Sequence, residues 1–404
     1  MSTDYNVILL SIDALRPDHL GAYGAKQLKT PHIDAIARDG SVFMNAFGSS
    51  CLTPIAHASI LSGFNPPGHG VRKPFDKVKA PFLSERLKSE GCQTAAFTGV
   101  GFLGSKYGFG RGFEYFNEVT QETAWGSKDY EIEGQGQTCW FGNHWWDDMI
   151  SWLEGHLREP FFIFGHYFEV HWGAEKRLLE KGWLSKNHLP ANGFYDAKIE
   201  FMDSCLVAPI VKCLRESGIW DRTIIVITAD HGENLGELPV ASGFYPQHRT
   251  LYECDLRIPL IIKAPKLPSG ERFDALARSI DIVPTLCDIL DLDDTGFDGS
   301  SLRKTIAAGD SQSAIAYAEE LYSLRGPGDW QAVRSNQYKY IIDRRSAKEH
   351  FFNMLLDPFE KNDLIGAVNT KEADIVQKWR QLCDRYRPDT EQPITQPGQA
   401  GIED

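Results

Sequence analysis

Acidic and imidazole side chains stand directly after two apolar stretches that are typical of buried strands. Asp13 follows one stretch, and Asp230 and His231 follow the other. Between them in the sequence lies a threonine hydroxyl, Thr53, in a stretch with helical pattern. Because the carboxyl ends of parallel strands meet at one edge of an open α/β sheet, these groups can share one crevice. Two carboxylates, a hydroxyl and an imidazole are donors that hold a divalent metal ion.

Each of these signals also has an ordinary structural explanation. An aspartate after a strand, such as Asp13, is often the N-cap of the next helix. Thr53 precedes Pro54 and can cap the helix that carries His57. The run Asp230-His231-Gly232 is more distinctive, because two ligand types are followed by a glycine turn that allows an ion to approach closely. Together the three segments favour a metal site over separate caps.

Apolar runs and helical patterns alternate along the chain. Strands are expected at 6–12, 94–98, 161–166, 223–228 and 258–263, and helices at 33–39, 83–90 and 203–216. This alternation predicts an α/β fold with a mostly parallel sheet covered by helices on both faces. Near the C-terminus, 332–342 is typical of a hairpin that turns at Ser335 and Asn336. The Pro, Gln and Gly content from 388 onward indicates a loose tail.

Further landmarks extend over nearly the whole chain and occur in a consistent order. They are 6–24, 30–34, 195–199, 228–233, 251–253, 258–262, 281–286 and 357–360. In these segments the chain resembles the alkaline phosphatase superfamily, specifically its sulfatase-like branch. The resemblance implies a mostly parallel sheet flanked by helices, with a small C-terminal antiparallel subdomain. We expect a metal-dependent catalytic domain over 1–310, the subdomain over 311–387 and the tail over 388–404.

The resemblance also implies a ligand set for one divalent metal ion. The matching positions are Asp13, Thr53, Asp230 and His231. Oxygen-rich ligation with one imidazole suits zinc or manganese. Sulfatase relatives use calcium or magnesium, so the identity of the metal stays open.

Three more histidines match pocket positions of the family and are expected to be catalytic. His57 stands where an arginine is common, His171 matches a histidine that binds the substrate or the leaving group, and His248 matches a pocket lysine or histidine. Surface histidines with ordinary partners are the alternative. Glu169, His171 and His248 also offer donors for a second ion, although their spacing differs from that of two-metal members, and this question stays open.

The nucleophile position departs from the sulfatase pattern. Sulfatases of this branch carry Cys or Ser there and convert it to formylglycine, but counting back from Leu61-Ser62-Gly63 places Thr53 at this position. Cys51 lies two residues too early, and threonine cannot form the aldehyde. The segment 99–104 lacks the two basic residues of the sulfate pocket. In the first loop Ala14 stands where many sulfatases have a second aspartate.

These departures determine the predicted reaction. Threonine nucleophiles in the superfamily belong to phosphoryl-transfer enzymes, so we predict a metal-dependent hydrolase of phosphoric monoesters or diesters with a covalent phosphothreonine at Thr53. The alternatives are a sulfuric-ester hydrolase (sulfatase), a phosphotransferase that delivers the phosphoryl group to an alcohol, and a binding protein without catalysis.

Composition restricts the partners. The chain has 404 residues with 42% hydrophobic content and a formal net charge of −13. The charge disfavours nucleic acid and anionic membranes as partners, and no apolar run is long enough to span a bilayer. Eight cysteines without a close-spaced framework, and a start that leads directly into a strand, predict a cytoplasmic protein with free thiols. We expect a small phosphoester or sulfoester substrate, and a homo-oligomer is left open.

The region 125–183 is rich in tryptophan. It holds seven of the ten tryptophans: Trp125, Trp140, Trp145, Trp146, Trp152, Trp172 and Trp183. Trp145, Trp146, Ile150 and Leu153 have helical spacing and are interpreted as core or as a subunit contact. An aromatic wall that selects a planar leaving group is the alternative.

Overall fold

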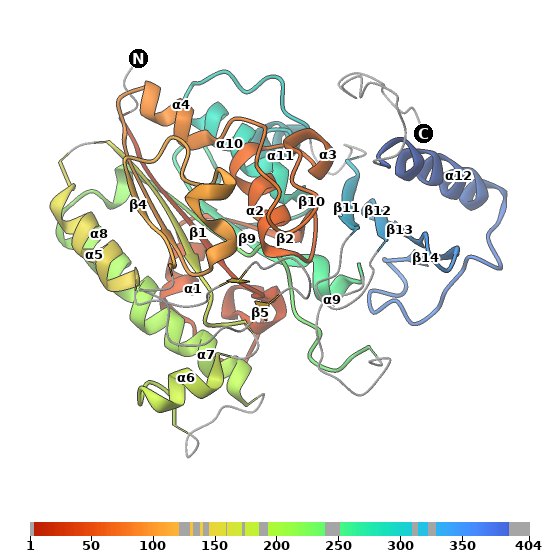
Figure 1. Cartoon of the computed structure of the whole chain (residues 1–404), viewed down its shortest axis with the longest axis horizontal. Coiled ribbons are helices and arrows are strands. Elements are labelled where there is room, and N and C mark those ends of the chain that lie inside the picture. Colours follow the sequence, from red (N-terminus) through yellow and green to blue (C-terminus); the bar gives the residue numbers. More distant parts are fainter. Residues whose placement is uncertain are drawn as a thin grey trace.

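An eight-stranded sheet with the order β10-β2-β9-β8-β1-β7-β3-β4 forms the centre of the computed structural model (Figure 1). Strand β9 runs antiparallel to β2 and β8, and the other neighbouring strands are parallel. The strands are β1 (Asn6–Ile12), β2 (Ser41–Phe47), β3 (Gln93–Thr98), β4 (Tyr115–Asn117), β7 (Phe161–Tyr167), β8 (Thr223–Thr228), β9 (Arg257–Lys263) and β10 (Glu271–Arg278). The structure describes residues 4–120, 130–131, 138–139, 145–158, 160–171, 174–185, 193–238, 251–308, 314–321 and 329–387. The predicted α/β fold class is confirmed.

Strand β1 lies between β7 and β8 and is buried along its whole length. Helices on both faces of a parallel sheet leave no solvated side, which explains why these strands are continuous apolar runs. Ser11 pairs with His166 of β7 on one side and with Thr228 of β8 on the other. The three strands therefore end at the same level, and the residues that follow them meet at one edge.

Helices cover both faces of this sheet. In Figure 1, α2, α4, α10 and α11 lie together on one side, and α1, α5, α7 and α8 lie on the other. The α-helices described before the C-terminal sheet are α1 (Pro31–Arg38), α2 (Thr53–Ser62), α3 (Pro66–His69), α4 (Leu83–Ser89), α5 (Trp145–Gly155), α6 (Glu175–Glu180), α7 (Phe194–Met202), α8 (Ala208–Glu216), α9 (Glu253–Leu256), α10 (Ile282–Ile289) and α11 (Leu302–Ala308). The helix expected at 203–216 begins with a π-helical turn at Asp203–Val207, next to Pro209, which has no N–H to donate.

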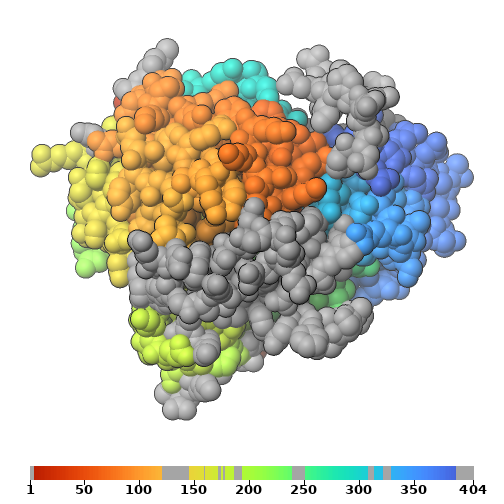
Figure 2. All heavy atoms as spheres, viewed as in Figure 1, coloured from red at the N-terminus to blue at the C-terminus, as the bar shows by residue number. Residues whose placement is uncertain are grey.

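A second, antiparallel sheet and a long helix form the C-terminal part of the chain, drawn in blue in Figures 1 and 2. It contains β11 (Ala316–Glu320), β12 (Trp330–Arg334), β13 (Tyr338–Asp343), β14 (Lys348–Asn353) and α12 (Thr370–Arg385). Strands β12 and β13 form the hairpin expected at Ser335 and Asn336. A short pair, β5 (Tyr130–Glu131) and β6 (Thr138–Cys139), stands apart from both sheets. The boundaries at 310 and 387 stay predictions.

The tryptophans of α5 belong to the core. Trp145, Trp146 and Leu153 are buried, and Trp145 stacks on Phe97 of β3 with ring centroids 6.1 Å apart. These contacts agree with the core interpretation, whereas Trp125, Trp140 and Trp172 lie outside the described residues. Among the helices of the described chain, none has the length and apolar character needed to cross a membrane.

Arg72 joins the region of the main sheet to the C-terminal sheet. Its guanidinium donates two hydrogen bonds to Glu319 of β11, at 2.7 and 2.5 Å, and one to the carbonyl oxygen of Tyr386. Glu319 is fully buried. A buried carboxylate that loses its cationic partner is strongly destabilised, so this pair makes the position of β11 sensitive to Arg72.

We therefore expect Arg72→Ala to lower the free energy of unfolding by about 3–5 kcal/mol, because Glu319 would be left as an uncompensated buried charge. Urea denaturation followed by circular dichroism measures the change. Lys88→Ala is the control, since Lys88 and Glu114 form a 3.8 Å pair between exposed side chains, and it should cost less than about 1 kcal/mol. Equal losses in the two variants would contradict the assigned role of Arg72.

Candidate active site

The three predicted segments meet at the carboxyl edge of the main sheet. Asp13 directly follows β1, and its backbone N–H donates to the carbonyl oxygen of Tyr167 at the end of β7. Thr53 is the first residue of α2, and its Oγ1 lies 3.4 Å from Asp13 Oδ2. His231 Nε2 lies 3.6 Å from Asp13 Oδ1 and 3.5 Å from Asp230 Oδ2. The four predicted metal ligands are thus brought together.

The hydrogen bond of His231 determines what it offers to this cluster. Its Nδ1 lies 2.8 Å from the carbonyl oxygen of Gly232, which only accepts, so Nδ1 carries the hydrogen. In the neutral imidazole Nε2 then presents a lone pair toward the two carboxylates. A nitrogen lone pair beside two carboxylates is a donor set that fits a cation.

Asp230 is held as a buried anion. Its Oδ1 accepts hydrogen bonds from the backbone N–H groups of Ala14 and His231, at 3.2 and 2.9 Å. Burial raises the pKa of this carboxyl, but the imidazoles of His231, His57 and His166 outweigh it and hold the pKa at about 2. Within the described part of the chain, Oδ2 accepts no hydrogen bond and is inaccessible to solvent. A divalent cation fits this oxygen, because buried polar atoms are otherwise paired.

His57 faces the nucleophile segment from the first turns of α2. Its Nδ1 donates to the carbonyl oxygen of Thr53 at 2.7 Å, and its Nε2 accepts from Ser11 Oγ at 2.9 Å. Burial, reinforced by His166, lowers the pKa of His57 to about 3. His57 is therefore a neutral ring that fixes the backbone of Thr53, unlike the charged arginine common at this position. Its catalytic role stays a prediction.

His166 belongs to the site but was not assigned from the sequence. The N–H of Gly99 donates to its Nδ1 at 3.3 Å, so Nε2 carries the hydrogen and donates to Asp13 Oδ2 at 3.2 Å. Burial lowers the pKa of His166 to about 4. The signal was present, because His166 is a polar residue near the end of the apolar run of β7 and pairs with Ser11, two residues before Asp13.

Of the two remaining predicted histidines, the structure describes His171 but not His248. His171 is half-buried, and its donor nitrogen lies within 4.8 Å of ligand atoms of Asp13 and His231. Lys198 Nζ donates to its carbonyl oxygen at 3.0 Å. His248 lies outside the described residues. Among the described residues, a second group of donors within 4.8 Å consists of His57, His166 and Asp230. The set of Glu169, His171 and His248 stays a prediction, because His248 is not described.

Cys51 lies near Thr53 but is unsuited to nucleophilic chemistry. The side chain is buried, and its Sγ donates to Glu320 Oε2 at 3.4 Å. Burial, together with Glu320 and Asp255, raises the pKa of this thiol well above its usual value. A thiolate is therefore strongly disfavoured. This environment agrees with the assignment of the nucleophile position to Thr53.

Side chains that fit a cation and a hydroxyl lie together at the carboxyl edge of a mostly parallel sheet, which is where enzymes with open α/β sheets bind their substrates. The chain belongs to the sulfatase family, because a sequence model of that family, named Sulfatase, matches residues 5–292.

Similar proteins support this assignment. The ulvan-active sulfatase of Formosa agariphila is 22% identical over 95% of this chain and 83% of its own. The Δ4,5-hexuronate-2-O-sulfatase of Bacteroides thetaiotaomicron is 22% identical over 94% and 88%. A protein solved in complex with its substrate D-glucosamine-2-N,6-O-disulfate has the same fold, with a TM-score of 0.74, 17% identity and coverage of 96% and 100%. The phosphonate monoester hydrolase of Agrobacterium radiobacter shares the fold at a TM-score of 0.65, with 18% identity and 95% of each chain covered.

The predicted hydrolysis of phosphoric esters is wrong. Relatives that match along nearly the whole chain are named sulfatases, which supports the alternative of sulfuric-ester hydrolysis. The error arose because one residue type, Thr53, was given more weight than the whole-chain pattern. An activated hydroxyl attacks phosphorus and sulfur by the same in-line displacement, so the residue type at that position does not distinguish the two esters.

Asp230→Asn tests the cation site. We expect the variant to lose most of its bound divalent metal, because a neutral amide binds hard cations more weakly than a carboxylate does. Metal analysis of protein reconstituted with zinc or manganese measures the stoichiometry. Asp281→Asn is the matched control, since Asp281 is also buried but pairs with Arg278, and it should retain the metal. Full metal content in Asp230→Asn would exclude the site.

Proposed function

We propose that the protein hydrolyses sulfuric esters with Thr53 Oγ1 as the nucleophile. Membership of the sulfatase family supports the ester type. The position of Thr53 Oγ1, 3.4 Å from Asp13 within a cluster of carboxylates and imidazoles, is the observation that carries the assignment of the nucleophile. Thr53 is half-buried, so a substrate can reach it, whereas Cys51 is enclosed.

In this proposal Asp13, Asp230, His231 and the hydroxyl of Thr53 would hold a divalent cation. When bound, such a cation would offset the carboxylate charge and polarise the sulfate group. The imidazole donors favour zinc or manganese over calcium and magnesium, which prefer oxygen ligands alone.

The first step transfers the sulfuryl group to the protein. The hydroxyl proton of Thr53 leaves along the hydrogen bond to Asp13 Oδ2 as Oγ1 attacks sulfur. The bond between sulfur and the ester oxygen breaks, and the leaving alcohol takes a proton from His171. The products of this step are the free alcohol and a sulfate ester of Thr53.

The second step restores the protein. Water attacks the sulfur of the sulfated Thr53, and the bond between sulfur and Oγ1 breaks. His171 takes a proton from this water, and Thr53 regains its proton from Asp13, so sulfate is the only product. Formylglycine hydrates release sulfate by collapse to the aldehyde, a route that threonine lacks. We therefore expect the second step to be slow and the sulfated protein to accumulate.

The surroundings of Thr53 favour a bound anion. Thr53 begins α2, a helix of ten residues whose N-terminus carries partial positive charge. The segment 99–104 has no ionisable side chain, and its Phe102 and Leu103 are buried apolar residues. The charge of the sulfate is therefore balanced by the cation and by the start of α2.

Substitutions of Thr53 test the nucleophile. Thr53→Ala should reduce kcat on an aryl sulfate by at least about 10³-fold and should abolish the sulfated protein, because no hydroxyl remains to attack. Thr53→Ser should stay within about tenfold of the wild type. Peptide mass spectrometry after rapid acid quench detects the sulfated residue. Cys51→Ala is the control and should keep both activity and intermediate; full activity in Thr53→Ala would refute the mechanism.

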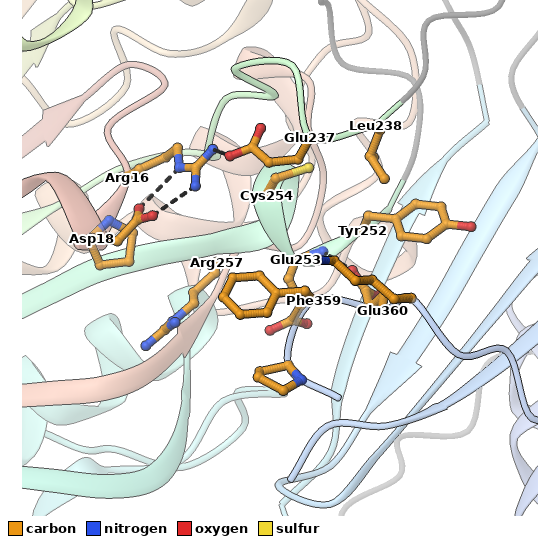
Figure 3. Close-up of a pocket in the computed structure, with 13 residues that line it drawn as sticks. Arg16, Asp18, Glu237, Leu238, Tyr252, Glu253, Cys254, Arg257, Phe359 and Glu360 are labelled. Carbon is orange, nitrogen blue, oxygen red and sulfur yellow. Dashed lines mark hydrogen bonds and ion pairs between the residues drawn. The ribbon is translucent and has the colours of Figure 1, made fainter. Parts of the chain in front are cut away.

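A cavity of about 560 Å³ beside the site suggests where the rest of the substrate binds. Figure 3 shows Tyr252 and Phe359 on its wall, with Arg16 and Glu237 at one end. Arg16 is three residues from Asp13, and three residues of chain span at most about 11 Å. The cavity has the size and mixed aromatic and polar lining of a small-molecule site. We propose that it accepts a sugar ring of a sulfated saccharide, in keeping with the sulfated glucosamine bound by the structural neighbour.

Phe359→Ala tests this cavity. Phe359 is 72% exposed, so its removal should not affect folding, but loss of an aromatic contact should raise KM for a sulfated disaccharide by about three- to tenfold. KM for a simple aryl sulfate should not change. Leu356→Ala is the matched control, because Leu356 is 84% exposed and does not line the cavity. Unchanged KM for the disaccharide in Phe359→Ala would exclude the cavity as the sugar site.

A further inference from the structure

We propose that Tyr195 is a positioning residue that sets the distance between Asp13 and Asp230 and thereby the affinity for the cation. This role rests on the proposed function, because it presumes a cation held by both carboxylates. Tyr195 lies in the first turn of α7, far in the sequence from either aspartate. It acts through the backbone of the turn that follows β1.

The key residue of that turn is Ala14. Its φ is 59°, a left-handed conformation that alanine rarely adopts, and its side chain is buried. In this conformation the N–H of Ala14 donates to Asp230 Oδ1 at 3.2 Å. The residue next to one carboxylate therefore holds the other carboxylate, so the conformation of Ala14 couples the two positions.

The hydroxyl of Tyr195 holds both sides of Ala14. It donates to the carbonyl oxygen of Ala14 at 2.7 Å and accepts from the N–H of Arg16 at 2.9 Å. Tyr195 itself is almost fully buried, and the ring of His19 packs edge-on against it at 4.9 Å. A single hydroxyl that donates and accepts thus opposes relaxation of the left-handed residue.

Arg16 adds a second connection between the same two loops. Its Nη1 donates to the carbonyl oxygen of Glu233 at 3.0 Å and to Glu237 at 2.5 Å, and its other nitrogens bind Asp18 (Figure 3). The loop after β1 is therefore tied to the loop after β8 at two points, Ala14 to Asp230 and Arg16 to Glu233. Tyr195 bonds to the backbone of both Ala14 and Arg16, so its loss loosens both ties.

Removal of the hydroxyl is expected to weaken cation binding more than folding. In Tyr195→Phe the turn loses the hydroxyl whose two hydrogen bonds hold Ala14 at a positive φ. The distance between Asp13 and Asp230 is then less well fixed. Loss of a group that orients metal ligands typically reduces metal affinity by about 10–100-fold. The phenylalanine ring keeps the packing against His19.

Tyr23→Phe provides a matched control. Tyr23 also places a hydroxyl on backbone groups of the main sheet, since it donates to the carbonyl oxygens of Phe43 and Leu260 and accepts from the N–H of Leu260. These groups lie on β2 and β9, away from the two aspartates. Both variants lose one hydroxyl that bonds to the backbone, so a general loss of stability should affect them alike.

The experiment measures cation affinity of the full chain. Metal-free wild type, Tyr195→Phe and Tyr23→Phe are titrated with zinc or manganese by calorimetry, and the melting temperature of each metal-free protein is recorded. We expect Kd to rise by about 10–100-fold in Tyr195→Phe and to stay within about threefold of wild type in Tyr23→Phe. Equal changes in the two variants, or no change in Tyr195→Phe, would overturn the proposal.

A second variant tests whether the effect of Tyr195 on cation affinity acts through the backbone of Ala14. Glycine adopts positive φ at no steric cost, so Ala14→Gly in the Tyr195→Phe background should restore part of the lost affinity. No recovery would overturn the assignment of the effect to Ala14. Aryl sulfate hydrolysis at saturating cation separates the two proposals. Suppose the wild type binds the cation and Tyr195→Phe lowers the affinity, but no sulfate ester is hydrolysed: the proposed function then fails and the role of Tyr195 stands. If the wild type binds no cation, both proposals fail.

Discussion

Two buried carboxylates that face the same imidazole nitrogen impose the main constraint on this structure. Asp13 and Asp230 end neighbouring parallel strands, and both approach His231 Nε2 within 3.6 Å. Charges of like sign repel strongly in a low-dielectric interior, so positive charge or polarised hydrogens must lie close by. The backbone N–H groups of Ala14 and His231, which donate to Asp230 Oδ1, supply part of this compensation. The proposed cation would supply the rest.

The backbone holds the histidines around this cluster in defined orientations. His57 donates to the carbonyl oxygen of Thr53, His231 donates to that of Gly232, and His166 accepts from the N–H of Gly99. Each bond determines which ring nitrogen carries the hydrogen. Such outer contacts orient metal ligands and tune their donor strength. The site therefore depends on the loops after β1, β3 and β8 as much as on the ligands themselves.

The type of one residue, Thr53, was not sufficient to predict which ester the protein hydrolyses. Thr53 replaces the residue that sulfatases convert to formylglycine, and the basic residues expected in 99–104 are absent. Both features turned the interpretation toward phosphoryl transfer. The family match over 5–292 and the named relatives support sulfuric-ester hydrolysis instead. These comparisons carry more weight than one residue because they extend over most of the chain. The chain is thus a sulfatase-family protein for which we propose a threonine hydroxyl as the nucleophile.

The sequence by itself determined most strands of the main sheet and indicated which residues are the proposed metal ligands. Apolar runs predicted β1, β7, β8 and β9, and the residues that follow β1 and β8 were recognised as one site, because parallel strands must end at a common edge. Strand order was decided only by tertiary packing, since the pairing of β1 with β7 and β8 joins segments more than one hundred residues apart.

Tertiary structure also decided the roles of residues whose chemistry depends on neighbours. His166 was missed because a histidine inside an apolar run looks like core until its level relative to Ser11 is known. The neutral state of His57 follows from burial beside another imidazole, which composition does not reveal. Local sequence specifies which groups are available, but ionisation and mutual distance depend on burial and on contacts between distant segments. Only the folded chain sets those two quantities.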